Sequence, residues 1–258
     1  MPALWDVAKE AGLTTAGVSW HVTVGAAIDV LFPESHQFPS EGTWLDLARR
    51  ESTPGLVDAV VEALGGFPPD GNRDPQGRDI FATAAAVHMI QTAQPNLLVV
   101  HMVQTDYAQH ASGRHSPEAK LAFAKVDAHV GEIVAAVRSA GIEARTAFVI
   151  TGDHGFYRVH SELQPNVILR RAGLLETDSE DKITAWRAAA HRGAIKLADG
   201  AGEETAAKAL AAFRELSEGR YRGLFRLVER AELDALGTDP EALFFIEPIE
   251  GYSIGGGF

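Results

Sequence analysis

The chain has 258 residues, of which 46% are hydrophobic, so it can bury a substantial core as one domain or two. Its net charge of -12 argues against binding to nucleic acid duplexes or anionic membranes, because phosphate-rich surfaces select basic proteins. It contains no cysteine, which excludes disulfide bonds, thiolate nucleophiles and cysteine-type zinc sites. No apolar run reaches transmembrane length, and the first residues are not typical of a signal peptide.

The first long irregular stretch is expected at residues 65–77, where Gly, Pro, Asn and Asp are too dense for a helix or a central strand. Residues 21–77 are interpreted as an insertion that carries helices and ends in this stretch. The sheet is expected to resume near residue 95.

A strand, a helix and a second strand are expected next. Residues 96–103 and 147–150 are both short, apolar and rich in β-branched side chains, as strands covered on both faces should be. The helix between them is predicted to be capped by Ser116, to begin at Pro117 and to be followed by Gly141. Its apolar residues recur with a period close to 3.6.

In the rest of the chain, predicted helices and strands alternate. A helix is expected at residues 203–217, after a break at residues 198–202. Further strands are expected at residues 166–169, 194–197 and 243–246. This alternation favours a layered α/β fold.

Two motifs follow the two strands of the strand–helix–strand unit. Asp106 and His110 follow the first strand, and Asp153 and His154 follow the second. The carboxyl ends of parallel strands joined by a right-handed crossover meet at one rim of the sheet, so we expect these four groups to face one crevice. Carboxylate and imidazole groups are ligands for zinc, and also for manganese or iron.

Two cations about 4 Å apart could hold the nucleophile and the leaving oxygen of a phosphate ester in line. An Asp-His-Gly sequence by itself is more often turn chemistry than a metal site. The repetition of an Asp/His pair after both strands favours the metal interpretation.

The resemblance to a known family extends well beyond these motifs. The stretches that carry it are Leu4–Trp20, Arg78-Asp79 with Ala84–Ala86, and Pro95–His101. With the two motifs, they resemble the type I phosphodiesterase and nucleotide pyrophosphatase family of the alkaline phosphatase superfamily. One departure is His21, because a Pro commonly follows the Trp of this pattern.

The resemblance implies an alkaline-phosphatase-like layered α/β/α fold with a mainly parallel central sheet and a helical insertion. It implies a metal-dependent hydrolase of phosphodiester or nucleotide pyrophosphate bonds, acting on a small phosphate ester or a nucleotide. Asp106 and His110 would bind one divalent metal ion, and Asp153 with His154 the other, with zinc as the first candidate.

The same resemblance places an early Asp ligand and a Thr or Ser nucleophile upstream of this chain, and a closing His ligand downstream of it. Residues 1–258 are therefore expected to be part of an alkaline-phosphatase-like domain and to be inactive by themselves. In the complete enzyme, water would release phosphate from the phosphorylated nucleophile. Neither Thr105 nor Thr151 is assigned that role. An export signal could precede the chain, which would make it secreted or periplasmic.

Other interpretations remain open at this point. A phosphomonoesterase, sulfatase or phosphonate hydrolase of the same superfamily would carry similar metal pairs, and a non-catalytic homologue would bind metal without turnover. Three histidines are expected to have structural or solvated roles: His88, His101 and His129. Three others lie in predicted loops and are candidates for the His ligand that the family pattern places downstream: His115, His160 and His191. The tryptophans Trp5, Trp20 and Trp44 are expected in the core more than in a substrate pocket.

Overall fold

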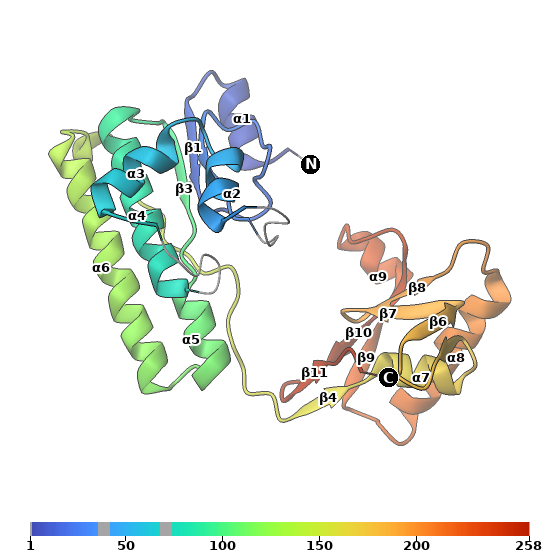
Figure 1. Ribbon diagram of the computed structural model, residues 1–258. Helices are drawn as coiled ribbons and strands as arrows, with labels where there is room; N and C mark the ends of the chain where they lie inside the picture. Colours follow the sequence, from blue (N-terminus) through green and yellow to red (C-terminus); the bar gives the residue numbers. More distant parts are fainter. Residues whose placement is uncertain (1, 36–41, 68–73, 258) are drawn as a thin grey trace. The chain divides into compact units, whose positions relative to one another are not determined.

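A computed structural model describes residues 2–35, 42–67 and 74–257 of the chain (Figure 1). The chain divides into two compact units, Met1–Phe156 and Tyr157–Phe258, which are described separately below. The expectation that residues 1–258 form part of a single domain stays a prediction.

The first unit is built on a three-stranded parallel sheet. Its strands are β1 (Thr15–Val18), β2 (Val30–Phe32) and β3 (Leu97–Val100), in the order β2-β1-β3. Val18 is in register with Phe32 on one side and with Val100 on the other, so all three strands end at the same level. Residues that follow these strands are therefore brought together at one rim of the sheet.

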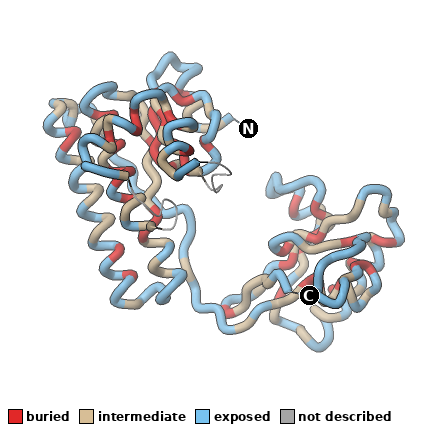
Figure 2. Tube along the Cα trace, in the orientation of Figure 1, coloured by how far each residue is buried: buried red, intermediate tan, exposed pale blue. Residues whose placement is uncertain are grey.

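Helices surround this sheet in the first unit. They are α1 (Leu4–Glu10), α2 (Trp44–Glu51), α3 (Leu56–Leu64), α4 (Pro75–Thr92), α5 (Gln104–Ser112) and α6 (Pro117–Ser139), with a short 3-10 turn at Glu143–Arg145. Helix α4 packs against β1 and β3, and its Phe81, Ala85 and Met89 are buried in the core. Helix α6 packs in turn against α4 and α5, as Figure 1 shows. Figure 2 shows that many buried positions of this unit lie on the sheet and on the helices around it.

The predicted boundaries of α6 are confirmed. The Ser116 side chain accepts a hydrogen bond from the Ala119 backbone N–H, Pro117 is the first helical residue, and Gly141 has a left-handed φ of 71°. Residues 21–77, which were predicted to be an insertion, carry the helices α2 and α3 and also β2, and their assignment as an insertion stays a prediction. The expectation that the sheet resumes near residue 95 is wrong, because β2 already pairs with β1 in the parallel sheet. Of the predicted loop at residues 65–77, residues 68–73 lie outside the described residues, and α4 already begins at Pro75 because Asp74 caps it.

The second unit has a four-stranded antiparallel sheet in the order β7-β8-β10-β9. These strands are β7 (Ala188–His191), β8 (Ala194–Leu197), β9 (Phe225–Glu229) and β10 (Ala242–Pro248). The smaller pairs are β4 (Ser161–Leu163) with β11 (Tyr252–Ile254), and β5 (Leu175–Thr177) with β6 (Ile183–Trp186). Helices α7 (Pro165–Arg171), α8 (Glu203–Glu218) and α9 (Arg230–Ala235) complete the unit, and Phe213 of α8 packs on Phe244 in the core.

In this unit the predictions for α8, β8 and β10 are confirmed, and the predicted strand at residues 166–169 is wrong. That segment lies in α7, where Pro165, Asn166 and Leu169 are buried. A one-turn spacing of buried residues is typical of a helix, and Pro165 at the first position favours the helical start.

The predicted strand at residues 147–150 is also wrong. The segment has no ladder partner, and the side chains of Val149 and Ile150 are 88% and 75% exposed. Among the described residues, β3 pairs with β1 alone. A β-branched sequence becomes a strand only where a neighbouring edge satisfies its backbone groups, and the segment finds none.

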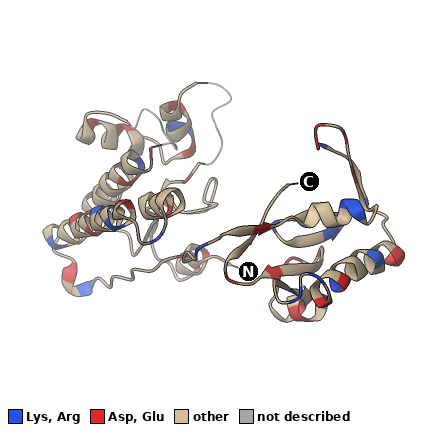
Figure 3. Cartoon of the chain, turned by 90° about the horizontal axis from the view of Figure 1, so that it is seen from below, with Lys and Arg blue, Asp and Glu red and all other residues tan. Residues whose placement is uncertain are grey.

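Charged side chains are distributed over both units. Figure 3 shows acidic and basic positions interspersed along the helices of each unit, in keeping with the acidic net charge. Across the described residues, the longest helices are too polar or too short to cross a membrane.

Candidate metal centre

Helix α5 carries the first predicted pair. Strand β3 ends at Val100 and α5 begins at Gln104, so Asp106 and His110 stand on a helix and not directly at the strand end. Their i, i+4 spacing places both side chains on one face of α5, with His110 Nε2 3.4 Å from Asp106 Oδ1.

The segment after α6 brings the second pair to the same place. His154 Nε2 lies 3.5 Å from Asp106 Oδ1 and 3.6 Å from Asp153 Oδ2. His110 and His154 therefore converge on Asp106, and Asp153 lies beside His154, although the expected second strand is absent. Their assignment as metal ligands stays a prediction.

The donor atoms around Asp106 suit a divalent cation. Asp106 Oδ1 is buried and accepts no hydrogen bond from any described residue, although it has an imidazole nitrogen on each side. Ligands at about 2.0–2.1 Å from a tetrahedral zinc ion lie about 3.3 Å from one another, close to the distance of Asp106 Oδ1 from each imidazole nitrogen. Among the described residues, Asp106, His110 and His154 do not form a group in which all three donor atoms lie within 4.8 Å of one another, so the two imidazoles would have to move closer to share one ion. The Nδ1 atom of His154 lies 3.2 Å from the Gly155 carbonyl oxygen, so a proton held there leaves Nε2 as the coordinating atom.

The charge of Asp153 is stabilised by its surroundings. Burial acts to raise the pKa of the Asp153 carboxyl, but the backbone N–H groups of Asp153 and His154 and the nearby imidazoles of His154 and His101 hold it below its ordinary value. A carboxyl group that stays ionised is ready to bind a cation without first losing a proton.

Phe156 and Arg114 hold the segment that carries Asp153 and His154 against α5. The Phe156 ring packs edge-on against the His110 ring, with the centroids 4.7 Å apart, and lies 5.4 Å from the His154 ring. Arg114 Nη1 donates a hydrogen bond of 2.7 Å to the Phe156 carbonyl oxygen. These contacts hold an otherwise exposed segment at the two imidazoles.

We expect Phe156→Ala to weaken zinc binding at this centre by about ten- to a hundredfold, because the ring orients both imidazoles without binding the ion itself. Isothermal titration calorimetry with zinc measures the change. Phe123→Ala is the matched control, since Phe123 is an exposed aromatic residue of α6. Equal affinities of Phe156→Ala and the control would contradict the orienting role.

Asp79 of α4 fixes the beginning of α5. Its buried carboxylate accepts hydrogen bonds from the backbone N–H groups of Val103, at 2.8 Å, and Gln104, at 3.0 Å. Val103 is the N-cap of α5 and supplies no side-chain cap, so Asp79 takes that role from a neighbouring helix. Burial raises the pKa of the Asp79 carboxyl above its ordinary value, although both hydrogen bonds act against that rise.

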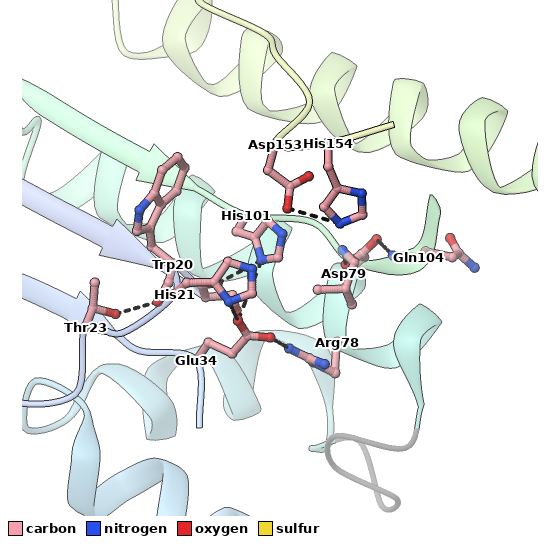
Figure 4. Close-up of polar contacts among 12 residues, drawn as sticks. Trp20, His21, Thr23, Glu34, Arg78, Asp79, His101, Gln104, Asp153 and His154 are labelled. Carbon is pink, nitrogen blue, oxygen red and sulfur yellow. Dashed lines mark hydrogen bonds and ion pairs between the residues drawn. The ribbon is translucent and has the colours of Figure 1, made fainter. Parts of the chain in front are cut away.

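A second group of metal-binding donors, which the sequence did not predict, lies at the rim of the parallel sheet. His21, Glu34 and His101 follow β1, β2 and β3, and one donor atom of each lies within 4.8 Å of the others (Figure 4). The His101 ring is half-buried, and burial together with the facing imidazole of His21 lowers its pKa. His101 was expected within a strand, but β3 ends one residue earlier. All three residues lie within a few positions after a parallel strand, and this pattern in the sequence could have predicted the group.

Glu34 also borders a small, partly open cavity of about 50 Å³. Its wall is mostly apolar and includes Phe32, Trp44 and Phe81, with Arg78 beside Glu34. This volume holds one or a few water molecules and is far below the several hundred Å³ of a nucleotide site. Trp44 thus lines a cavity, but not one of substrate size.

The remaining sequence candidates lie elsewhere. His115 is exposed in the turn before α6, and His160 and His191 belong to the second unit. Within the described ranges, none of them joins a group of three metal-binding donors. The Thr151 hydroxyl donates to the Gly152 carbonyl oxygen at 3.1 Å, and the residue is exposed.

Solved structures with the same fold come from two kinds of hydrolase. Murine ectonucleotide pyrophosphatase / phosphodiesterase 5 is 14% identical, with a TM-score of 0.58 over 99% of this chain and 56% of its own. Phosphonoacetate hydrolase from Sinorhizobium meliloti 1021 is 17% identical, with a TM-score of 0.62 over 99% of this chain and 60% of its own. The fold is thus the alkaline-phosphatase-like α/β fold, as predicted, and this chain spans less than two thirds of either relative.

Residues 2–233 match the family described as type I phosphodiesterase / nucleotide pyrophosphatase. The chain belongs to this family of hydrolases, which confirms the resemblance seen in the sequence. No curated protein matches the chain in a sequence search.

Proposed function

We propose that this chain supplies metal ligands to a hydrolase of phosphodiester or nucleotide pyrophosphate bonds. Asp106 and His110 bind one divalent ion in this proposal, and Asp153 with His154 binds the other. The observation that carries it is the buried Asp106 Oδ1, which lacks a hydrogen bond to the described residues and lies 3.4 and 3.5 Å from two imidazole nitrogens.

The chemistry of the donors supports zinc first, with manganese or iron as alternatives. Such ions supply Lewis-acid stabilisation of the phosphoryl oxygens when bound. The chain's own contribution is to hold the donors in place: α5 positions Asp106 and His110, and Phe156 and Arg114 position the segment that carries His154.

The substrate class is inferred from relatives of the same fold. One solved structure of the murine relative, an inactive variant, is a complex with AMP, and the phosphonoacetate hydrolase was solved with phosphonoformate. We therefore propose a small phosphate ester or a nucleotide as the substrate. Residues 1–258 would form part of one alkaline-phosphatase-like domain, with residues 21–77 as an insertion over the substrate side.

The test is turnover of bis(p-nitrophenyl) phosphate and of p-nitrophenyl thymidine 5′-phosphate with added zinc or manganese. We expect residues 1–258 alone to show no useful turnover, because no residue of this chain is assigned as the nucleophile. A protein extended in frame at both ends should hydrolyse the diesters, and a chelator should stop it. Chelator-sensitive turnover by residues 1–258 alone would contradict the assignment and direct attention to Thr105 and Thr151.

Two comparisons separate the neighbouring functions. If p-nitrophenyl phosphate, p-nitrophenyl sulfate or phosphonoacetate is turned over faster than the diesters, the enzyme is a monoesterase, a sulfatase or a phosphonate hydrolase of the same superfamily. If the extended protein binds zinc but turns over none of these compounds, the chain is a non-catalytic homologue. In that case the assignment of the metal ligands holds, and the proposed hydrolysis of diesters is wrong.

A further inference from the structure

We infer that His21, Glu34 and His101 form a separate binding site for one divalent transition-metal ion, of the zinc class, at the carboxyl rim of the parallel sheet. None of these residues belongs to the pairs formed by Asp106, His110, Asp153 and His154. The inference does not rest on the proposed function.

The topology of the sheet creates this site. The ends of β1, β2 and β3 are level, since Val18 is in register with both Phe32 and Val100. The chain leaves each strand at the same rim, so residues far apart in sequence meet there. Figure 4 shows the side chains of His21, Glu34 and His101 directed toward one another.

The donors are close enough for a small adjustment to place them around one ion. His21 Nδ1 lies 2.5 Å from Glu34 Oε2, and His101 Nδ1 lies 3.8 Å from the same oxygen. The spacing of about 3.3 Å expected between zinc ligands lies between these values. The His21 side chain is 46% exposed, so its ring can rotate to open the shorter contact.

The surroundings hold two of the donors in place. The side chain of Glu34 is only 2% exposed, and the guanidinium group of Arg78 binds its other oxygen, Oε1. The Nδ1 atom of His101 also lies 3.2 Å from the carbonyl oxygen of Ser19, a contact that positions the ring without an ion and that Nδ1 gives up when it coordinates one. A hydrogen bond to the second oxygen of a ligating carboxylate, as Arg78 supplies to Glu34, is typical of metal sites.

The types of donor select the ion. Two imidazoles and one carboxylate match a zinc site that keeps an open position for water or another ligand. Magnesium and calcium prefer oxygen ligands and should bind poorly. The nearby charge of Arg78 and the small number of protein ligands predict weaker binding than at a closed structural zinc site.

The experiment measures cobalt and zinc binding to the purified chain. Cobalt reports its coordination through visible absorption, and calorimetry gives zinc affinity and stoichiometry. The variants are His21→Ala, Glu34→Gln and the double variant Asp106→Ala/Asp153→Ala. His191→Ala is the matched control, because His191 is an exposed imidazole of the second unit.

We expect His21→Ala and Glu34→Gln each to weaken the binding of one zinc or cobalt ion, the ion held by His21, Glu34 and His101, by at least about tenfold. The His191→Ala control and the double variant should still bind this ion, and magnesium should not compete with it. His21→Ala keeps the test decisive if Glu34→Gln fails to fold, because His21 is half-exposed and Glu34 is buried.

The inference is overturned if cobalt absorption and zinc affinity are the same in His21→Ala and wild type. It is also overturned if the double variant loses all binding while His21→Ala loses none. The three side chains would then serve only as an ion-pair network around Glu34 and Arg78. If wild type and the double variant Asp106→Ala/Asp153→Ala bind zinc equally, and only the binding that His21→Ala weakens is seen, the metal assignment in the proposed function is contradicted and this inference stands.

Discussion

Asp106→Ala should remove most zinc binding at the Asp106 centre, with an affinity loss of at least about a hundredfold. Asp106 Oδ1 lies within 3.5 Å of an imidazole nitrogen of both His110 and His154, so its loss separates the two predicted pairs. The affected ion would retain too few protein ligands for tight binding. Calorimetric titration with zinc at neutral pH, with the stoichiometry read from the same curve, measures the loss.

Asp127→Ala is the control for this change. Asp127 is an exposed carboxylate of α6, so its removal alters the net charge by the same amount and leaves the centre intact. In the extended protein, Asp106→Ala should also remove diesterase activity. Zinc affinity that falls equally in Asp127→Ala would mean that general charge, and not coordination, drives the binding.

Asp79→Ala should destabilise the chain by about 2–4 kcal/mol. The substitution leaves the backbone N–H groups of Val103 and Gln104 without their buried acceptor and removes the cap of α5. Urea denaturation monitored by circular dichroism measures the free energy of unfolding. Asp58→Ala is the control, because Asp58 is exposed and its ion pair with Arg49 is worth at most about 1 kcal/mol.

A related prediction concerns pH. A folded-state pKa above the ordinary value means that the folded chain binds the Asp79 proton more tightly than the unfolded chain does. The stabilising contribution is therefore complete below about pH 4, the ordinary pKa of Asp, and is lost as pH rises through the folded-state pKa. The stability advantage of wild type over Asp79→Asn should shrink from pH 4 to pH 7. A pH-independent difference would show that burial does not raise this pKa.

Asp79 also links stability to the metal centre. It holds the first turn of α5, and the next residues of that helix carry Asp106 and His110. A variant that folds without this cap should therefore bind zinc more weakly even though no ligand is changed.

The sequence predicted those elements whose signals are local. Ser116, Pro117 and Gly141 mark the ends of α6, and these residues act within one turn of the positions they specify. The family could also be predicted from the sequence, because the resemblance depends on short motifs and their order. The convergence of Asp106 with His154 followed from the same motifs, although the strand that was expected to deliver His154 is absent.

The tertiary structure decided what depends on partners distant in sequence. Residues 147–150 have the composition of a strand, yet the segment is exposed because no sheet edge among the described residues receives it. Residues 167–169 carry apolar side chains that suit a strand or a helix, and burial against the second core selects the helix.

The His21, Glu34 and His101 cluster also depends on long-range pairing. Its members stand behind three strands whose order, β2-β1-β3, differs from their order in the sequence. Local propensity determines where a strand ends, but only pairing of the strands determines which ends lie side by side. The sequence by itself therefore determined the class of protein and predicted the candidate ligands around Asp106, whereas the sheet decided which other side chains gather at its rim.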